Sequence, residues 1–372
     1  MRQKRKIVNR GFSFLWLLFI VCYSTSCNFP FLNSDQSNSN NSEESEALFT
    51  PISFSFLTLG NQYNGDSIYI KAGDKDILID AGSRQNSASV IETYIDRYCN
   101  DKKIEYVIVT HAHQDHIAAF CGDNGILAKY KVDTIIDFGE TKISSGIYGK
   151  YQTARDKCVQ NGSCYYSAKD CFYEQNGGKK EIALGNDLSM RILYQEAYDK
   201  VPSSSEENNN SVCLLFSQGE KKMLFTGDLE KKRCQSLLDS NEIGEVDLYK
   251  GGHHGSINAN EDFFIDAIKP KTICTCCVAG SDEYTDVKEN TMPYQKTINN
   301  WAKYTDDVYL TSYMKVDEDN ESNVSYEPLN GDIQVSYDSL GNKSISCSVS
   351  SKKLKDTDWL KNNRSIPLEW AS

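Results

Sequence analysis

The chain has 372 residues, a formal net charge of −12 and 39% hydrophobic residues. This length is sufficient for one large buried core. An acidic chain does not present a general binding surface for polyanions, which argues against tight non-specific binding of nucleic acid. A phosphate could still bind in a local basic groove or to bound metal.

The first 27 residues have the pattern of an export signal. Five basic residues precede an apolar run at positions 12–23, and small residues from Ser24 onwards lead to Cys27. The run is shorter than the roughly 17–25 apolar residues of a transmembrane helix, so a cleaved signal is favoured over a signal-anchor. Cys27 resembles a lipoprotein cleavage site, although Ser24 stands where leucine is usual. We expect an exported chain that is held at the cell surface through lipid on Cys27 or is secreted.

Residues 28–50 form a Ser-, Asn- and Glu-rich tract with almost no apolar residue after Leu32. Such a tract cannot offset its ordering entropy by burial, so we interpret it as a disordered tether between a membrane surface and a folded domain. Removal of residues 1–27 takes away five basic and no acidic side chains, which changes the formal net charge from −12 to −17. We assign the folded domain to residues 51–350 and a C-terminal tail to residues 351–372.

Two blocks of apolar segments follow the tether, and each block has strands before a helix. Apolar runs between Gly and Asn turns predict that the first three strands are antiparallel. The predicted strands are 52–59, 67–72, 76–80, 104–109, 189–194, 212–217, 222–226, 246–250 and 272–278, and the predicted helices are 88–98, 229–241 and 293–303. Two such halves imply an α/β protein in which two facing sheets have helices outside, an αββα four-layer sandwich in a single domain.

Cysteines are frequent in the region beyond the signal. Eleven of the 13 cysteines lie beyond Cys27, and Cys158, Cys164 and Cys171 fall in an insert with little apolar periodicity. In an exported protein this pattern favours at least one disulfide in the insert, with a zinc knuckle as the alternative. The three cysteines of the apolar run 272–278 are expected to be core thiols.

The sequence Thr-His-Ala-His-Gln-Asp-His at residues 110–116 holds three of the five histidines. Residues two apart point the same way in an extended loop, so His111 and His113 can converge on one cation. Asp115 and His116 can reach a neighbouring cation where the chain turns into a helix. Imidazole nitrogen with carboxylate oxygen suits zinc, manganese or iron, and sites with an open position are catalytic. A polar loop that is His-rich by chance is the alternative.

Three further motifs follow apolar strands in the order of the chain. Asp80 ends the sequence Ile-Leu-Ile-Asp, Asp228 ends Thr-Gly-Asp, and residues 250–256 read Lys-Gly-Gly-His-His-Gly-Ser. Together with residues 110–116, these motifs resemble the metallo-β-lactamase-fold hydrolases. The form of the last motif is similar to the ComEC-like branch, which is named for the hydrolase domain of a DNA-uptake competence protein. The resemblance covers about residues 53–349.

The resemblance implies that Asp228 bridges two metal ions and that Asp80 orients a ligand histidine without binding metal. A turn-capping role is the alternative for Asp80. Two cations about 3.5–4 Å apart bridge a hydroxide, lower its pKa and clamp the attacking and leaving oxygens of a displacement. Asp115 would be both a ligand and the residue that orients the attacking water and accepts its proton. The expected cofactors are two divalent ions, Zn²⁺ first and Mn²⁺ second.

One ligand differs from the lactamase-like members of the family. Those members have another His before the Gly-Asp motif, whereas residues 117–252 contain none. Asn210 is the nearest candidate to fill this position, through its amide oxygen or a bound water. Such a weak ligand favours harder metals such as Mn²⁺.

The adjacent pair His253 and His254 competes for the last ligand position. His253 lies closer to the end of the strand and is expected to bind metal, whereas His254 is expected to contact the substrate or a proton. Ser256 is expected to lie next to the metal ligands or to contact the substrate.

These features predict an exported hydrolase with two metal ions that acts on a phosphodiester, and the branch resemblance extends the substrate to DNA outside the cell. The expected partners are a phosphoester and, through an N-terminal anchor or lipid, a membrane; no protein partner is inferred. One alternative is hydrolysis of phosphocholine or another small phosphoester. The cation of such a substrate would be attracted to acidic side chains around the site. The other is a surface-anchored binding protein whose site has lost its catalytic metal.

Overall fold

The structure is a computed structural model that describes residues 49–285, 287–316 and 324–371. The predicted export signal with Cys27, and the predicted tether up to residue 48, lie outside the described residues. Within the described ranges, no helix is both long and apolar enough to cross a bilayer.

The first sheet is built from both ends of the described chain. Its strands are β1 Ile52–Phe56, β2 Ile68–Ala72, β3 Lys75–Ile79, β4 Lys103–Val109, β5 Lys131–Asp137, β6 Cys164–Ser167, β15 Ile333–Tyr337 and β16 Lys343–Cys347. The order across the sheet is β16-β15-β1-β2-β3-β4-β5-β6. Strands β1, β2 and β3 are antiparallel, as predicted, and β3 to β6 run parallel to one another.

The second sheet has the same number of strands and also mixes the two directions. Its strands are β7 Glu181–Gly185, β8 Leu188–Ile192, β9 Leu214–Gln218, β10 Lys221–Phe225, β11 Leu248–Lys250, β12 Ile273–Ala279, β13 Val308–Val316 and β14 Val324–Pro328. The order is β14-β13-β12-β11-β10-β9-β8-β7, with β10 to β13 parallel. The second sheet thus has its own parallel centre.

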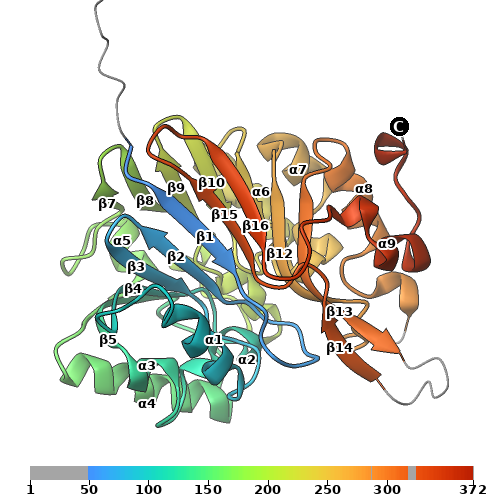
Figure 1. Cartoon of the computed structure of the whole chain (residues 1–372). Helices are drawn as coiled ribbons and strands as arrows, with labels where there is room; N and C mark the ends of the chain where they lie inside the picture. The colour runs from blue at the N-terminus through green and yellow to red at the C-terminus, as the bar shows by residue number, and fades with distance from the viewer. Residues whose placement is uncertain (1–48, 286, 317–323, 372) are drawn as a thin grey trace, which may run out of the picture. The chain divides into compact units, whose positions relative to one another are not determined.

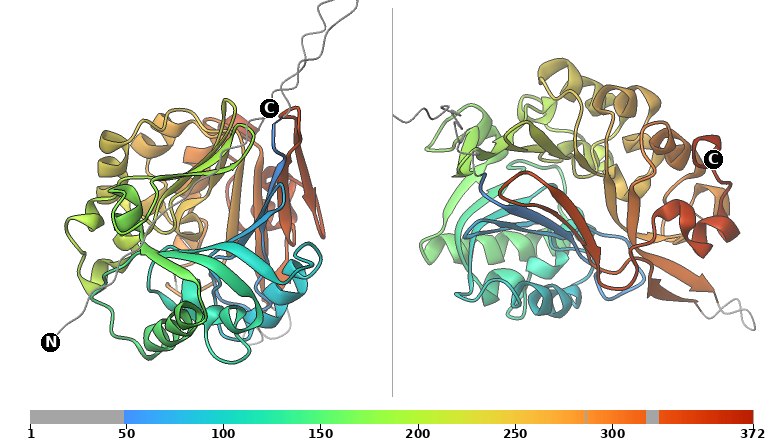
Figure 2. Two further views of the ribbon diagram at one scale, coloured as in Figure 1. Left: turned by 90° about the vertical axis from the view of Figure 1, so that its left-hand side faces the viewer. Right: turned by 45° about the horizontal axis from the view of Figure 1, so that its top comes forward.

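Helices cover the outer faces of the two sheets (Figure 1 and Figure 2). The α-helices are α1 Ser87–Ile95, α2 Gln114–Ile117, α3 Ile126–Lys129, α4 Gly146–Gln160, α5 Ala168–Phe172, α6 Lys231–Ser240, α7 Asp262–Ile268, α8 Gln295–Ala302 and α9 Asp358–Asn363. The 3-10 helices are η1 Ala118–Phe120, η2 Glu196–Tyr198, η3 Ser204–Asn210, η4 Gly252–Gly255, η5 Ile257–Ala259, η6 Lys288–Asn290, η7 Leu354–Asp356 and η8 Leu368–Trp370.

Apolar side chains fill the space between the sheets and the space under the helices. The ring of Phe54 on β1 lies 5.3 Å from the rings of both Phe216 and Phe225 on the second sheet. On the other face of the second sheet, Tyr249 belongs to a separate buried cluster that includes Trp301 of α8. Two packed sheets with helices outside confirm the predicted αββα sandwich.

The predicted insert is part of the first sheet and not a separate loop. Ser145 is the N-cap of helix α4 and its side chain accepts a hydrogen bond from the Tyr148 N–H, while β6 pairs in parallel with β5. Cys158, Cys164 and Cys171 are free thiols, so the expected disulfide is wrong. No metal-ligand group among the described residues includes any of the three. The reason is packing, because α4 and α5 bury Cys158 and Cys171 in the core while β6 leaves Cys164 exposed.

The cysteines of β12 behave as predicted. Cys274, Cys276 and Cys277 are fully buried in the described chain, and burial raises the pKa of each thiol. These residues are confirmed as core thiols.

The C-terminal segment packs against the second sheet and its helices. Leu354, Trp359, Leu360 and Trp370 are buried in the same cluster as α8. The indole of Trp370 also donates to the carbonyl of Thr305 at 2.9 Å. The segment 354–370 therefore contributes to the core.

Leu360→Ala should lower the free energy of unfolding by about 2–5 kcal/mol, because it opens a cavity under a fully buried side chain. Leu368 in the same segment is 89% exposed, so Leu368→Ala is a matched control that should change stability by less than about 0.5 kcal/mol. Denaturant unfolding followed by circular dichroism measures both. Equal effects of the two substitutions would contradict the packing of this segment.

Candidate metal centre

Four strand ends bring the motif residues together. Asp80 follows β3, the loop 110–116 follows β4, Asp228 follows β10, and the pair of histidines follows β11. Strands β3 and β4 are parallel neighbours, and so are β10 and β11. Their carboxyl ends therefore open at one edge of each sheet, where loops on a rigid scaffold can aim side chains.

Four of the predicted residues converge on one point. The ligand-type atoms of Asp115, His116, Asp228 and His254 all lie within 4.8 Å of one another. The Oδ2 atom of Asp228 is 3.1 Å from Nε2 of His116 and 3.4 Å from Nε2 of His254. Nε2 of His254 is also 3.4 Å from Oδ2 of Asp115. Three of the four side chains are fully buried, and that of Asp115 is 13% exposed.

His116 and His254 are each oriented by a hydrogen bond at Nδ1, the ring nitrogen other than the one that faces the cluster. Nδ1 of His116 lies 2.7 Å from Oδ2 of Asp80, and Nδ1 of His254 lies 3.0 Å from the carbonyl oxygen of Cys276. Both acceptors favour a proton on Nδ1, which leaves Nε2 directed at the carboxylates. Asp80 is itself held by the N–H and hydroxyl of Thr110, each at 2.7 Å. The structure thus gives Asp80 the position that orients His116.

His111 and His113 form a pair beside this cluster. Nε2 of His111 is 3.0 Å from Nδ1 of His113, and the rings of His111 and His116 are 4.1 Å apart. Two ring nitrogens that meet in this way can share one cation. Among the described residues, however, no third His, Cys, Asp or Glu completes a group with this pair.

The adjacent histidines lie in different surroundings. His254 is fully buried and belongs to the cluster, whereas His253 is 15% exposed and its Nε2 is 3.8 Å from Oδ2 of Asp228. Both residues have left-handed backbone angles, with φ of +44° for His253 and +50° for His254. Non-glycine residues rarely adopt this conformation, and the local turn re-aims the second side chain inwards. His254 thus lies closer than His253 to Asp228, whereas the sequence analysis expected His253 to be the ligand.

Two other candidates lie outside the cluster. The amide of Asn210 donates to the carbonyl of Glu140 at 2.9 Å and to Glu207 at 3.3 Å. No hydrogen bond joins Asn210 to the described histidines. Ser256 accepts from the N–H of Asn258 at 3.4 Å and caps η5. The structure thus gives Ser256 a capping contact in the turn after His254.

Sequence reasoning missed two buried charged residues. The ammonium of Lys250 is paired with Asp66 and also lies 3.0 Å from the carbonyl of Gly227 and 3.3 Å from Oδ1 of Asp228. Oδ1 of Asp66 lies 3.4 Å from Nδ1 of His254. A lysine in an apolar strand directly before the Gly-Gly-His-His sequence could have marked Lys250 as a buried charge. Asp66 follows Gly65 and belongs to no recognisable motif.

Tyr284 is a third missed residue, at the solvent side of the centre. Its hydroxyl donates to Oδ2 of Asp115 at 3.0 Å, and its side chain is 49% exposed. A donor at this position can contact both a ligand carboxylate and a bound molecule. No sequence pattern marks it, because the contact joins segments 169 residues apart.

Protonation in the centre follows from burial and from the neighbouring charges. Burial lowers the pKa of His254, but the carboxylates of Asp228 and Asp66 outweigh burial and raise that pKa to about 10. Burial raises the pKa of Asp115, but the hydrogen bond from His254 and the charge of His116 hold it below its usual value. Burial also holds the pKa of His111 well below its usual value. Ionised carboxylates beside imidazoles are the donor set of a divalent metal site.

The backbone of the metal loop depends on one close approach. A Cβ added to Gly82 would lie 1.5 Å from the carbonyl oxygen of Asp115. The neighbouring Ala81 N–H donates to the carbonyl of His116 at 2.8 Å, and the Asp66 N–H donates to that of Asp115 at 3.1 Å. Only glycine allows the two segments to meet in this arrangement.

These residues fit a divalent metal. Buried carboxylates gather at this place in the described chain, those of Asp66, Asp80 and Asp228, close to Asp115. The buried ammonium of Lys250 lies among them and is paired with Asp66 and Asp228. Burial of this many carboxylates is costly unless further positive charge lies beside them. The oxygen and imidazole donors suit divalent ions, although the donor set does not distinguish Zn²⁺ from Mn²⁺.

Comparison with known proteins gives the same family. The Metallo-beta-lactamase superfamily matches residues 60–120. ComE operon protein 3 of Bacillus subtilis is 27% identical over 230 residues, which are 56% of this chain and 26% of that protein. Recombination protein 2 of Haemophilus influenzae is 30% identical over 206 residues, 55% of this chain and 22% of that protein. The chain spans about a quarter of the length of these relatives.

Among solved structures, a mutant metallo-β-lactamase from Cronobacter sakazakii is 16% identical, covers 57% of this chain and 80% of that chain, and has a TM-score of 0.30. This likeness is too low to support an argument. The superfamily match and the two curated relatives, together with the two-sheet architecture, confirm the resemblance in the sequence: the chain has the metallo-β-lactamase fold of metal-dependent hydrolases and is similar to the ComEC-like branch of that family.

Proposed function

We propose that this chain is a phosphodiesterase that uses two divalent metal ions. The observation that supports the proposal most is the convergence of Asp115, His116, Asp228 and His254 within 4.8 Å, in a family of metal-dependent hydrolases. The ComEC-like resemblance supports a nucleic acid, and DNA in particular, as the substrate. Export and attachment to a membrane, through lipid on Cys27 or another N-terminal anchor, belong to the same proposal.

Each metal ion would have its own set of ligands. Asp115, His116 and His254 would hold one ion, and His111 with His113 would hold the other, with Asp228 shared between them. Asn210 remains a candidate for the position that lacks a histidine. Divalent ions at such a centre act as Lewis acids on a phosphoryl oxygen and lower the pKa of water.

Residues around the ligands would prepare the centre for this chemistry. Asp80 and the carbonyl of Cys276 direct the Nε2 atoms of the two buried histidines inwards. Lys250 offsets the negative charge of Asp66 and Asp228, so that fewer uncompensated charges are buried. Tyr284 donates to Asp115 at the solvent side, where a phosphate oxygen would enter.

The two adjacent histidines should differ in their effect on metal binding. His254→Ala should weaken metal binding by about tenfold or more, the scale seen even for residues that only support a ligand. His253→Ala should retain most of the metal, because its side chain is more exposed and farther from Asp228. Elemental analysis after dialysis at fixed free Zn²⁺ or Mn²⁺ compares the variants. A greater loss in His253→Ala would restore the assignment that the sequence suggested.

Gly82→Ala should displace the backbone of Asp115 and reduce metal affinity by about tenfold, a scale like that of residues that orient ligands. Gly149→Ala in α4 is the control, because a Cβ at Gly149 meets nothing within 4 Å. Titration with Zn²⁺ measures both affinities. Unchanged affinity in Gly82→Ala would mean that the loop 110–116 tolerates displacement.

Asp115→Asn tests hydrolysis itself. It retains the size of the side chain and removes the charge that would orient water and accept a proton, so turnover of bis(4-nitrophenyl) phosphate should fall by about 10²-fold or more. Asp123→Asn, at an exposed position of the loop after η1, is the control and should leave turnover unchanged. Wild-type turnover that equals that of Asp115→Asn at every metal concentration would point to a contaminating enzyme and reject the proposal.

A further inference from the structure

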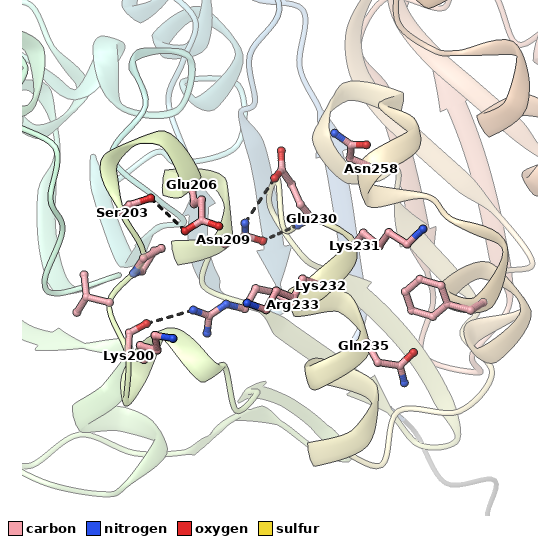
Figure 3. Close-up of a pocket in the computed structure, with 13 residues that line it drawn as sticks. Lys200, Ser203, Glu206, Asn209, Glu230, Lys231, Lys232, Arg233, Gln235 and Asn258 are labelled. Carbon is pink, nitrogen blue, oxygen red and sulfur yellow. Dashed lines mark hydrogen bonds between the residues drawn. The ribbon is translucent and has the colours of Figure 1, made fainter.

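A pocket of about 960 Å³ is lined by residues outside the group that converges at the metal centre (Figure 3). Its walls come from residues 200–203, from the 3-10 helix η3, from the first turn of α6 and from the start of α7. Cavities of this size hold small ligands or one unit of a larger substrate. The roles assigned above to the metal ligands do not use this pocket.

The lining of the pocket is rich in positive charge, although the chain as a whole is acidic. Lys200, Lys231, Lys232 and Arg233 are opposed by two glutamates only. The ammonium groups of Lys200 and Lys232 have no hydrogen-bond acceptor or ion-pair partner among the described residues, and both side chains are exposed. These two charges are available to a ligand.

The remaining charges of the pocket are engaged within the protein. Arg233 is buried, donates to the carbonyl of Lys200 at 3.2 Å and lies 3.2 Å from a carboxylate oxygen of Glu196. Glu230 accepts from the side-chain amides of Asn208 at 3.1 Å and Asn209 at 3.4 Å. Arg233 therefore fixes the floor of the pocket, and the amides reduce the repulsion that Glu230 would exert on an anion.

The first turn of α6 adds to the attraction for an anion. This helix has ten residues, begins after Glu230 and has no acidic residue in its first turn. The N-terminus of a helix has a partial positive charge and free N–H groups that favour a phosphate. The helix end and the two free ammonium groups thus act on the same space.

One wall of the pocket is apolar. Val201, Pro202 and the half-buried Phe263 line it. An aromatic ring next to basic side chains is the combination that binds single-stranded nucleic acid, because bases stack on the ring while phosphates contact the cations. A simple phosphate site would not need the apolar wall.

His253 connects the pocket to the metal centre. Its Nε2 atom is 3.8 Å from Oδ2 of Asp228, and its Nδ1 atom is 3.8 Å from Oε1 of Glu230, which lines the pocket. Nδ1 of His253 is buried without a hydrogen-bond partner in the described chain. A substrate that extends from the centre into the pocket would pass this side chain.

We propose that the pocket holds the nucleotide next to the phosphodiester at the metal centre, with a phosphate against Lys200 and Lys232 and a base against Phe263. The substrate class is then a single-stranded nucleic acid and not an isolated small diester. This inference rests on the proposed phosphodiesterase function, and it explains how an acidic chain can bind a polyanion at one local site.

Binding without turnover tests the pocket directly. The double variant Lys200→Ala/Lys232→Ala should bind a fluorescein-labelled single-stranded oligonucleotide, in EDTA at low salt, about tenfold more weakly than wild type. The negative slope of log K against log salt should become less steep by about 0.7, the contribution of one lost phosphate contact on a single strand. The control Lys157→Ala/Lys352→Ala removes the same charge from exposed positions elsewhere and should keep both values. Equal weakening in both double variants, or none in either, overturns the proposal.

A third variant separates nucleic acid from other polyanions. Phe263→Ala should weaken binding of the oligonucleotide but not of inorganic polyphosphate, because only the oligonucleotide has bases to stack. An equal effect on both ligands would overturn the assignment of a nucleotide. Far-UV circular dichroism checks that each variant is folded.

Turnover distinguishes failure of this inference from failure of the proposed function. If wild type hydrolyses bis(4-nitrophenyl) phosphate, the ratio of kcat/KM for the oligonucleotide to that for the small diester should fall about tenfold in Lys200→Ala/Lys232→Ala. An unchanged ratio rejects the pocket and leaves the phosphodiesterase in place. Absence of turnover with either substrate at saturating Zn²⁺ and Mn²⁺ rejects the phosphodiesterase and, with it, the role of the pocket in catalysis.

Discussion

Four aspartate carboxylates are wholly or largely buried at one edge of the two sheets, and the contacts around them compensate this negative charge. Asp66, Asp80 and Asp228 are buried, and Asp115 is nearly so. Buried charges of one sign are costly unless cations or hydrogen bonds compensate them. Lys250 and the imidazoles supply part of this compensation, and divalent metal would supply the remainder. The arrangement is therefore better explained by metal binding than by stability.

The scaffold makes this concentration of charge possible. Parallel strands in both sheets end at the same edge, so residues from four loops meet there. Two unusual backbone features set the final geometry: the contact of Gly82 with the carbonyl of Asp115, and the left-handed turn at His253 and His254. Both are local departures from regular structure, as is common at functional sites.

The sequence predicted the two-sheet architecture and singled out the four residues whose ligand-type atoms converge, because apolar periodicity and short motifs are local signals. It did not predict that residues 164–167 form a strand of the first sheet, since β6 pairs with β5, a strand about 30 residues earlier in the chain. It favoured His253 over the more deeply buried His254, because the direction of a side chain after a glycine pair depends on backbone angles that residue types do not fix. Asp66 and Tyr284 were missed for a similar reason, as their contacts exist only after folding.

In the function proposed above, the metal centre would cut one phosphodiester while the basic pocket holds the next nucleotide. Binding of metal by His254 and Asp228 can be observed by anomalous diffraction at the zinc absorption edge, from crystals grown with saturating Zn²⁺. We expect an anomalous peak within bonding distance of Nε2 of His254 and a carboxylate oxygen of Asp228. A peak bound to His253 in place of His254, or none at this position, would show that these two residues do not hold the metal.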